Sequence, residues 1–170
     1  MTTPKPRRNG TKSTEQMSFD KVDRQILKII QENSDMPISA IADAVGLTAT
    51  PCWRRIKRME ESGLISKRVA LVDQAMANVP MTIFIGLSAP RHEKDWIDRF
   101  RALIDDIPEI IEAYRLTGTV DYILKVVVPD VAAYDTVYKR MIEKLDFTRV
   151  NGMISMEEMK FTTAIPTDYL

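Results

Sequence analysis

The feature of this chain that most constrains its fold is the apolar pattern of residues 38–61, ISAIADAVGLTATPCWRRIKRMEE. Between Ile38 and Val45, apolar side chains recur at positions i, i+3, i+4 and i+7, which predicts a short helix with one apolar face. Gly46 then provides the backbone freedom for a sharp turn, and Leu47 can fill the angle between two helices. The pattern therefore predicts two helices joined by a tight turn.

The second of these helices is predicted to begin directly after the turn. Thr48 or Thr50 is suited to the N-cap position, and Pro51 falls in the first turn, where its missing amide hydrogen would have had no partner. The apolar positions of this helix share one side, and they are Cys52, Ile56 and Met59. Its other side is polar and basic.

A short helix, a glycine-containing turn and a second helix with a basic side are typical of a helix-turn-helix that reads double-stranded DNA. Short helix pairs also occur in many all-α domains, and a basic helix side is often only solvated. If the pair does bind DNA, we expect Trp53 and Arg54 to approach base edges and the cations that follow to bind mainly phosphates. The residues predicted to bind DNA are Thr48, Thr50, Trp53, Arg54, Arg55, Lys57 and Arg58.

The neighbouring segments favour the DNA-binding interpretation. Upstream, apolar residues within 22–30 predict a third amphipathic helix, which is long enough to complete a three-helix core. Downstream, the basic helix ends near Gly63, and Leu64-Ile65 begins an apolar segment that we expect to be a strand. A strand at that place would make the domain a winged helix-turn-helix.

The distribution of charge agrees with this interpretation. Residues 1–68 contain 13 Lys and Arg against 8 Asp and Glu, a net charge of +5, whereas residues 69–170 contain 11 against 16, a net charge of −5. A basic N-terminal part suits a polyanion, and an acidic C-terminal part is repelled by one. We therefore expect an N-terminal DNA-binding domain and a C-terminal domain with a different task.

The sequence also argues against several classes of protein. It has no apolar run near the roughly 20 residues that span a bilayer and no apolar secretory signal, so we expect a cytoplasmic location. Cys52 is the only cysteine and falls on an apolar helix face, where we expect it to be a core residue. Because His92 is the only histidine and no phosphate loop or nucleophile–base arrangement occurs, we expect no metal, no cofactor and no enzymatic activity.

The remainder of the chain predicts an α+β domain with the element order βαββαβ. Apolar residues alternate in the strands and recur at helical spacing in the helices, and the predicted elements cover residues 81–88, 96–107, 110–116, 122–128, 134–145 and part of 150–162. This ferredoxin-like order gives a four-stranded antiparallel sheet with both helices on one face. Whatever the register, Phe84, Val126 and Val128 give both faces of the sheet some apolar side chains, so we expect two copies to associate.

These elements divide the chain into five parts. We predict a disordered basic tail over 1–17, a helix-turn-helix domain over 18–65, a linker over 66–79, a βαββαβ domain for effector binding and oligomerisation over 80–163, and a C-terminal tail over 164–170.

Four stretches give the chain a resemblance to the Lrp/AsnC family, the leucine-responsive and asparagine-responsive transcriptional regulators. Residues 20–27, DKVDRQIL, resemble the family's opening D-x-x-D-x-x-I-L, and residues 45–56, VGLTATPCWRRI, are similar to its V-G-L-S-x-[ST]-[PA]-C-x-x-R-[IV]. Residues 121–126, DYILKV, with Pro129-Asp130 resemble D-Y-[LI]-L-K-V followed by P-D. Residues 156–160, MEEMK, resemble the closing strand. The resemblance covers about residues 19–162.

The resemblance implies a sequence-specific transcriptional regulator whose assembly or DNA affinity responds to an amino acid or a related small metabolite. Because a dimer places two recognition helices on half-sites about one helical turn apart, we expect its DNA site to be an imperfect palindrome. The resemblance implies that dimers assemble further to an octamer. In such relatives the turn between the middle strands lies beside an effector pocket formed where dimers meet. The effector-binding residues implied here are Gly118, Thr119, Val120, Asp121 and Tyr122.

This turn departs from the family pattern. The family's turn reads Gly-Asp-aromatic-Asp, whereas residues 118–121 read Gly-Thr-Val-Asp, with one acidic group fewer. Asp121 is suited to bind the ammonium of an amino acid, with the amides near Thr119 facing the carboxylate. The alternative at this position is a tight turn whose backbone Asp121 bonds.

The departure at Thr119 also leaves open an architectural DNA-binding protein without a ligand. A further alternative is an enzyme, since certain tetrapyrrole decarboxylases look like these regulators. That chemistry calls for histidines between subunits, and the only histidine in this sequence is His92.

Overall fold

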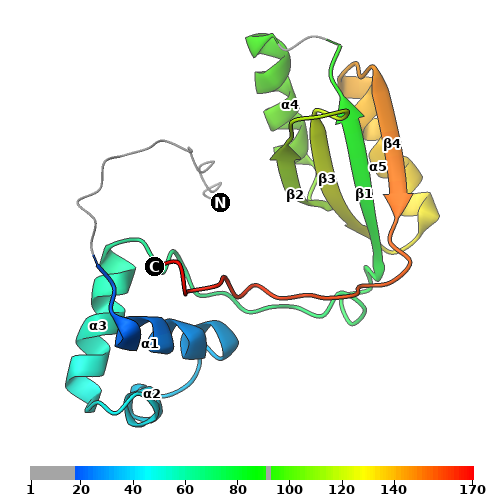
Figure 1. Ribbon diagram of the computed structural model, residues 1–170. Helices are drawn as coiled ribbons and strands as arrows, with labels where there is room; N and C mark the ends of the chain where they lie inside the picture. Colours follow the sequence, from blue (N-terminus) through cyan, green and yellow to red (C-terminus); the bar gives the residue numbers. More distant parts are fainter. Residues whose placement is uncertain (1–17, 91–92) are drawn as a thin grey trace. The chain divides into compact units, whose positions relative to one another are not determined.

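The computed structural model describes residues 18–90 and 93–170 (Figure 1). The chain forms two compact units, the first comprising the described residues up to Val69 together with Thr162–Leu170, and the second comprising Ala70–Phe161. The predicted tail over 1–17 and His92 lie outside the described residues. None of the helices in the described part is long and apolar enough to cross a membrane.

The first unit contains three helices, α1 (Lys21–Glu32), α2 (Ile38–Ala44) and α3 (Ala49–Glu61). One apolar stripe from each helix meets in a common core, made of Ile26, Leu27, Ile30, Ile41, Ala42, Cys52, Ile56 and Met59. The predicted core position of Cys52 is confirmed, and burial raises the pKa of its thiol. Gly46 has a φ of +70° in the turn between α2 and α3, which is the conformation that favours glycine there.

The strand predicted to begin at Leu64-Ile65 is absent, and the described chain contains no strand between α3 and the sheet of the second unit. Gly63 ends α3 with a φ of +79°, and the amide of Ile65 donates to the carbonyl of Met59 at 3.1 Å. Leu64 and Ile65 then pack against the three-helix core. Their apolar character serves a helix terminus, in which an apolar residue after the glycine contacts the last turn.

The C-terminal segment, predicted as a separate tail, packs against α1. The side-chain amide of Gln31 donates to the carbonyl of Ile165 at 3.1 Å and accepts from its amide at 2.7 Å. Lys28 pairs with Asp168 at 3.2 Å. The side chain of Thr167 is buried. Residues 162–170 thus belong to the same unit as the helix-turn-helix.

The second unit has the predicted βαββαβ order. Its elements are β1 (Met81–Ser88), α4 (Lys94–Asp106), β2 (Ile110–Arg115), β3 (Tyr122–Val128), α5 (Val131–Lys144) and β4 (Arg149–Ile154). The strands form one antiparallel sheet in the order β2-β3-β1-β4. Both helices lie on the same face of this sheet (Figure 1). The stretch 156–160, which resembles the family's closing strand, lies beyond the end of β4.

The two faces of the sheet differ in what covers them. Ile83, Ile85 and Leu87 of β1 face the helices and are fully buried with alternate residues of β3. Phe84 points to the opposite face, where it is 36% exposed and pairs across the strands with Lys125 and Met153. The second unit therefore has one packed face and one open face that carries apolar side chains.

Candidate nucleic-acid interface and effector turn

The start of α3 presents a polar surface directly after the turn. Thr48 occupies the N-cap position, as one of the two predicted alternatives, and its hydroxyl makes no capping bond. Thr50 and Pro51 lie in the first turn and are exposed. Because the amides of a helix's first turn lack intrahelical acceptors, this end of α3 offers hydrogen-bond donors to an outside partner.

Trp53 and Arg54 continue this surface along α3. The side chain of Trp53 is 49% exposed, an unusual position for so large an apolar group. Arg54 is also exposed, and within the part of the chain that the structure describes it has no hydrogen-bond or ion-pair partner. With Thr50 and Lys57 they fall at i, i+3, i+4 and i+7, which places these side chains on one side of the helix.

Lys57 lies one turn further along the same side. It pairs with Glu60 at 3.4 Å, and its side chain is 49% exposed. An exposed pair of this kind contributes little to stability, so it leaves the ammonium of Lys57 able to exchange its partner for another anion.

Arg55 and Arg58 bind carboxylates at the start of α1, although Arg58 follows Arg54 by one helical turn. Arg55 donates to Asp20 at 2.7 Å and to Asp23 at 2.9 Å, and Arg58 donates to Asp23 at 2.5 Å. The side chain of Asp23 is completely buried, whereas those of Arg55 and Arg58 are 29% and 46% exposed. The two arginines predicted to bind phosphates are therefore engaged within the domain.

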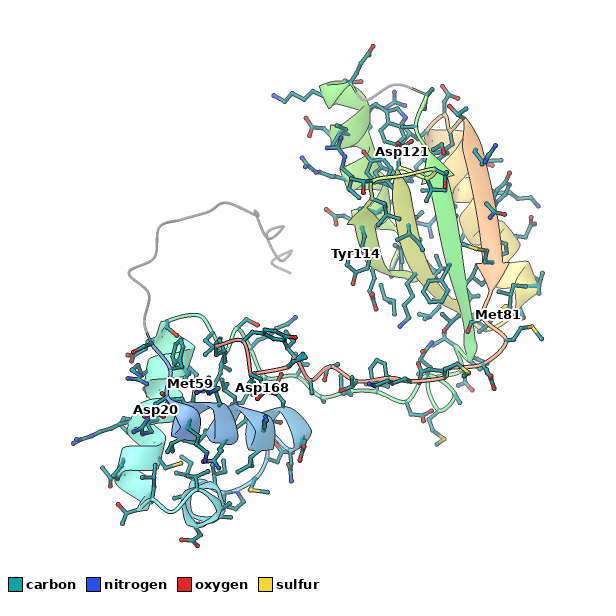
Figure 2. All side chains as sticks on the ribbon, viewed as in Figure 1. Asp20, Met59, Met81, Tyr114, Asp121 and Asp168 are labelled. Carbon is teal, nitrogen blue, oxygen red and sulfur yellow. The ribbon has the colours of Figure 1, made fainter. Side chains whose placement is uncertain are left out.

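The hydrogen bonds of this cluster shift the pKa values of Arg55 and Asp20 in opposite directions. Hydrogen bonds to Asp23 and then to Asp20 raise the pKa of Arg55 above its ordinary value. A hydrogen bond from the amide of Asp23, followed by one from the side chain of Arg55, lowers the pKa of Asp20. Arg58 also lies over the ring of Phe19, with 5.6 Å from its guanidinium carbon to the ring centroid. Figure 2 shows Asp20 at the start of α1, beside α3.

The turn predicted to bind an effector joins β2 to β3 in the second unit. Gly118 has a φ of +123°, and residues 115–119 are exposed. The amide of Leu116 donates to the carbonyl of Asp121 at 2.8 Å, which closes the turn. A Cβ atom placed on Gly86 would lie 3.4 Å from Val120, so that the side chain of Val120 rests on the backbone of β1.

Asp121, labelled in Figure 2, ties this turn to the end of β1 through two hydrogen bonds. Its amide donates to the carbonyl of Leu87 at 2.8 Å, and its carboxylate accepts from the amide of Ala89 at 2.9 Å. The carboxylate thus bonds backbone, as in the structural alternative, although the amide is that of Ala89, directly after β1, and not one of the turn itself.

Tyr122 is placed differently from its predicted role. Its ring lies in the core between sheet and helices, with its centroid 4.7 Å from that of Phe100 and 5.7 Å from that of Trp96. Because alternate residues of a strand point to opposite faces, the first residue of β3 turns inward when Ile123 and Lys125 face outward. Tyr122 is therefore a core residue and is removed from the candidate effector site.

A hollow of about 500 Å³ in the second unit is lined by residues of two segments, 71–82 and 155–161, and does not include the turn residues 118–121. Among the described residues no group of three or more His, Cys, Asp and Glu side chains is arranged to hold a metal ion.

Two functional features were missed in the sequence. The spacing of Asp20 and Asp23 on α1 matches the spacing of Arg55 and Arg58 on α3, since each pair is three residues apart on a helix. This complementary charge spacing was the available signal. The docking of residues 165–170 on α1 had no comparable signal, because its main contacts are side-chain bonds to backbone.

Comparison with known proteins gives matches over both units. Residues 19–66 match a family model described as winged helix-turn-helix DNA-binding, and residues 82–165 match one described as Lrp/AsnC ligand binding domain. The HTH-type transcriptional regulator Zrp of Zymomonas mobilis is 40% identical over 89% of this chain and 99% of its own length.

Two solved structures share the fold along nearly their whole length. An AsnC family transcriptional regulator from Agrobacterium tumefaciens is 47% identical, with a TM-score of 0.86 over 89% of this chain and 99% of that one. A transcriptional regulator from Neisseria meningitidis in complex with L-Met is 29% identical, with a TM-score of 0.85 and the same coverage of both chains.

Proposed function

Because the chain belongs to the Lrp/AsnC family of DNA-binding transcriptional regulators, we propose that it selects its target sequence through one side of α3. In this proposal Thr48, Thr50, Trp53 and Arg54 contact base edges, and Lys57 binds a phosphate. Arg55 and Arg58 are assigned instead to the carboxylates of α1.

The observation that carries this proposal is the contrast between neighbouring cations on α3. Arg54 is exposed and has no partner within the described chain, whereas Arg55 is bound to two carboxylates. A guanidinium without an internal partner is free to form the bidentate pair with guanine that specifies sequence. The exposed ring of Trp53 lies next to Arg54 in the sequence, and it offers an apolar surface to the methyl group of a thymine.

The test compares Arg54→Ala with Lys57→Ala. The probe is a duplex enriched from a random-sequence library by the wild-type protein, measured beside a random duplex of equal length. Arg54→Ala is expected to weaken binding to the enriched duplex by about 1–3 kcal/mol and to relax the preference for particular bases. Lys57→Ala is expected to weaken binding to both duplexes alike. The salt slope, which is the steepness with which the logarithm of the binding constant falls with the logarithm of the salt concentration, is expected to decrease by about 1. Normal preference in Arg54→Ala would refute the assignment of base reading to this residue.

We further propose that the turn Gly118–Asp121 binds an amino acid or a related metabolite between subunits. Support comes from the L-Met complex of the Neisseria meningitidis relative and from the exposed glycine and hydroxyl groups of this turn. The bond from the amide of Ala89 fixes the orientation of the Asp121 carboxylate. A carboxylate held in this way can receive an ammonium without first losing side-chain entropy.

The effector proposal is tested by thermal shift with the twenty amino acids on wild type, Thr119→Val and Asp121→Asn. A ligand at 100 times its Kd stabilises by about 2.7 kcal/mol, and this stabilisation is the quantity to compare. Loss of the ligand-induced shift in Thr119→Val supports the site, because that substitution removes an exposed hydroxyl and no bond of the fold. Equal shifts in all three proteins place the ligand elsewhere. Absence of any shift in wild type favours the architectural alternative.

A third proposal concerns assembly, and it rests on the open face of the sheet. Phe84 at its centre, Tyr114 on β2 and Met153 on β4 are 36%, 54% and 44% exposed. A neighbouring pair, Lys125 and Glu112, lies on the same face at 3.4 Å. Exposed apolar groups around a paired lysine and glutamate can be buried against a second copy of the same sheet, because a two-fold association brings the same patch of each copy together. Further assembly to an octamer stays a prediction.

A further inference from the structure

Asp20 and Asp23 at the start of α1 bind two arginines of α3, and the proposed contacts of α3 with DNA bases do not explain why. The carboxylate of Asp23 has 0% exposure and receives three donors, Arg55 at 2.9 Å, Arg58 at 2.5 Å and the backbone amide of Asp20 at 3.0 Å. A carboxylate with no exposed surface has lost its water, so these partners must compensate for its charge.

The same cluster controls the orientation of α3. Arg55 and Arg58 are one turn apart, and a single carboxylate holds both. Two bonds from successive turns of a helix to one fixed group restrict rotation of that helix about its axis. The first turn of α1 is fixed in its turn by the reciprocal bonds of the capping box between Asp20 and Asp23. The orientation of Trp53 and Arg54 about the axis of α3 is thereby fixed relative to α1.

The cluster also changes the charge that α3 offers to DNA. Four cations lie on this helix, and two of them are neutralised by Asp20 and Asp23. Each cation that contacts a phosphate adds to affinity for any sequence and contributes nothing to discrimination. Fewer free cations therefore mean weaker non-specific binding.

From these contacts we infer that Asp23 is a positioning residue that sets sequence selectivity: it withholds Arg55 and Arg58 from the DNA backbone and fixes the rotation of α3. The inference rests on the proposed function of α3. It reverses the expectation for two of the basic residues, which here act on another part of the protein and not on phosphate.

The experiment measures binding of the full chain to the enriched duplex and to a random duplex over a range of salt concentrations. Asp23→Asn keeps the shape of the side chain and removes its charge. It is expected to steepen the non-specific salt slope by about 1 to 2, since Arg58 loses its carboxylate, Arg55 keeps only Asp20, and each phosphate contact adds about 0.9. The ratio of specific to non-specific affinity is expected to fall about tenfold, which is the size of one lost base contact.

Glu61→Gln is the matched control, because it makes the same change of net charge on an exposed side chain of α3 that has no partner in the described chain. It is expected to leave the selectivity ratio unchanged. Equal behaviour of Asp23→Asn and Glu61→Gln would show that only net charge matters and would overturn the inference.

Arg58→Gln keeps the test decisive if Asp23→Asn fails to fold, because Arg58 is nearly half exposed. An unchanged non-specific salt slope with a lower selectivity ratio supports the inference. A slope reduced by about 1 with the ratio preserved means that Arg58 binds phosphate, which overturns it. Failure of the proposed function is separate, since it would appear as normal selectivity in Arg54→Ala.

Discussion

At the scale of single residues, Tyr122 shows how a buried polar atom can distinguish a core role from a binding role. Its side chain is 6% exposed, and its hydroxyl has no hydrogen-bond partner in the described structure. A buried hydroxyl without a partner has lost its bonds to water and costs free energy. Tyr122 is therefore held in place by its ring, which packs against Trp96 and Phe100.

We predict that Tyr122→Phe raises the free energy of unfolding of the second unit by about 1 kcal/mol, because it removes the unpaired hydroxyl. The measurement is urea unfolding followed by the fluorescence of Trp96, in a protein whose Trp53 is replaced by Phe. Tyr114→Phe is the control, since the hydroxyl of Tyr114 donates to Glu112 at 2.7 Å on the exposed face. A clear loss of stability in Tyr122→Phe, or a loss of ligand-induced shift, would contradict the core assignment.

The basic residues of α3 mark the limit of prediction at this scale. Helical spacing placed Cys52, Ile56 and Met59 correctly in the core, because the apolar stripe depends only on the sequence of α3 itself. The partner of Arg55 depends on how α1 crosses α3, and that geometry is set by contacts far apart in the chain. Residue type and spacing therefore predicted a basic helix, but they did not separate its internal ion pairs from its exposed cations.

At the scale of elements, local patterns predicted the helices and strands but not how some of them end. The alternation in residues 81–88 and the helical spacing in 134–145 correspond to β1 and α5. The strand predicted at Leu64-Ile65 was wrong because two apolar residues after a glycine fit a helix terminus as well as a strand. The helix terminus forms because the three-helix core offers a surface on which the side chains of Leu64 and Ile65 pack.

The start of α1 gives a prediction about acid stability. The folded pKa of Asp20 is lowered from 3.8, first by the amide of Asp23 and then by Arg55. A depressed folded pKa contributes stability that is present above the unfolded value and is lost as the pH falls through the folded one. We therefore expect α1 and α3 of wild type to lose stability below about pH 4, and Asp20→Asn to show a weaker dependence in that range.

Amide NMR signals of α1 and α3, followed as the pH is lowered, provide the measurement. Asn retains the capping ability of Asp, so the substitution removes the titrating charge and not the cap. Asp43→Asn on α2 is the control, since Asp43 is exposed and has no ion pair within the described chain. Identical acid profiles for wild type and Asp20→Asn would exclude this contribution.

At the scale of the whole molecule, the chain brings together a unit that binds DNA and a unit whose sheet has one uncovered face. The uncovered face could be predicted from sequence, because alternating apolar residues in four strands exceed what two helices on one side can cover. A ligand role for the turn 118–121 could not be predicted from the strand pattern alone, because alternation fixes which side chains face the helices and says nothing of what a second copy adds beside the turn. A site formed between subunits is completed only by a second copy.

Self-association through this face is the last prediction. Phe84→Lys places an ammonium beside Lys125 at the centre of the open face, and association would bury like charges from both copies. Burying such a charge without a partner costs several kcal/mol, so we expect the dimer to weaken at least about a thousandfold, or about 4 kcal/mol. Ile142→Lys on α5 is the matched control, because Ile142 is 43% exposed and lies on the helical side of the unit.

Sedimentation at micromolar concentration should give at least twice the chain mass of 19.4 kDa for wild type and the control, and the single-chain mass for Phe84→Lys. A wild-type monomer would rule out the dimer, and an unchanged mass in Phe84→Lys would place its interface on another surface.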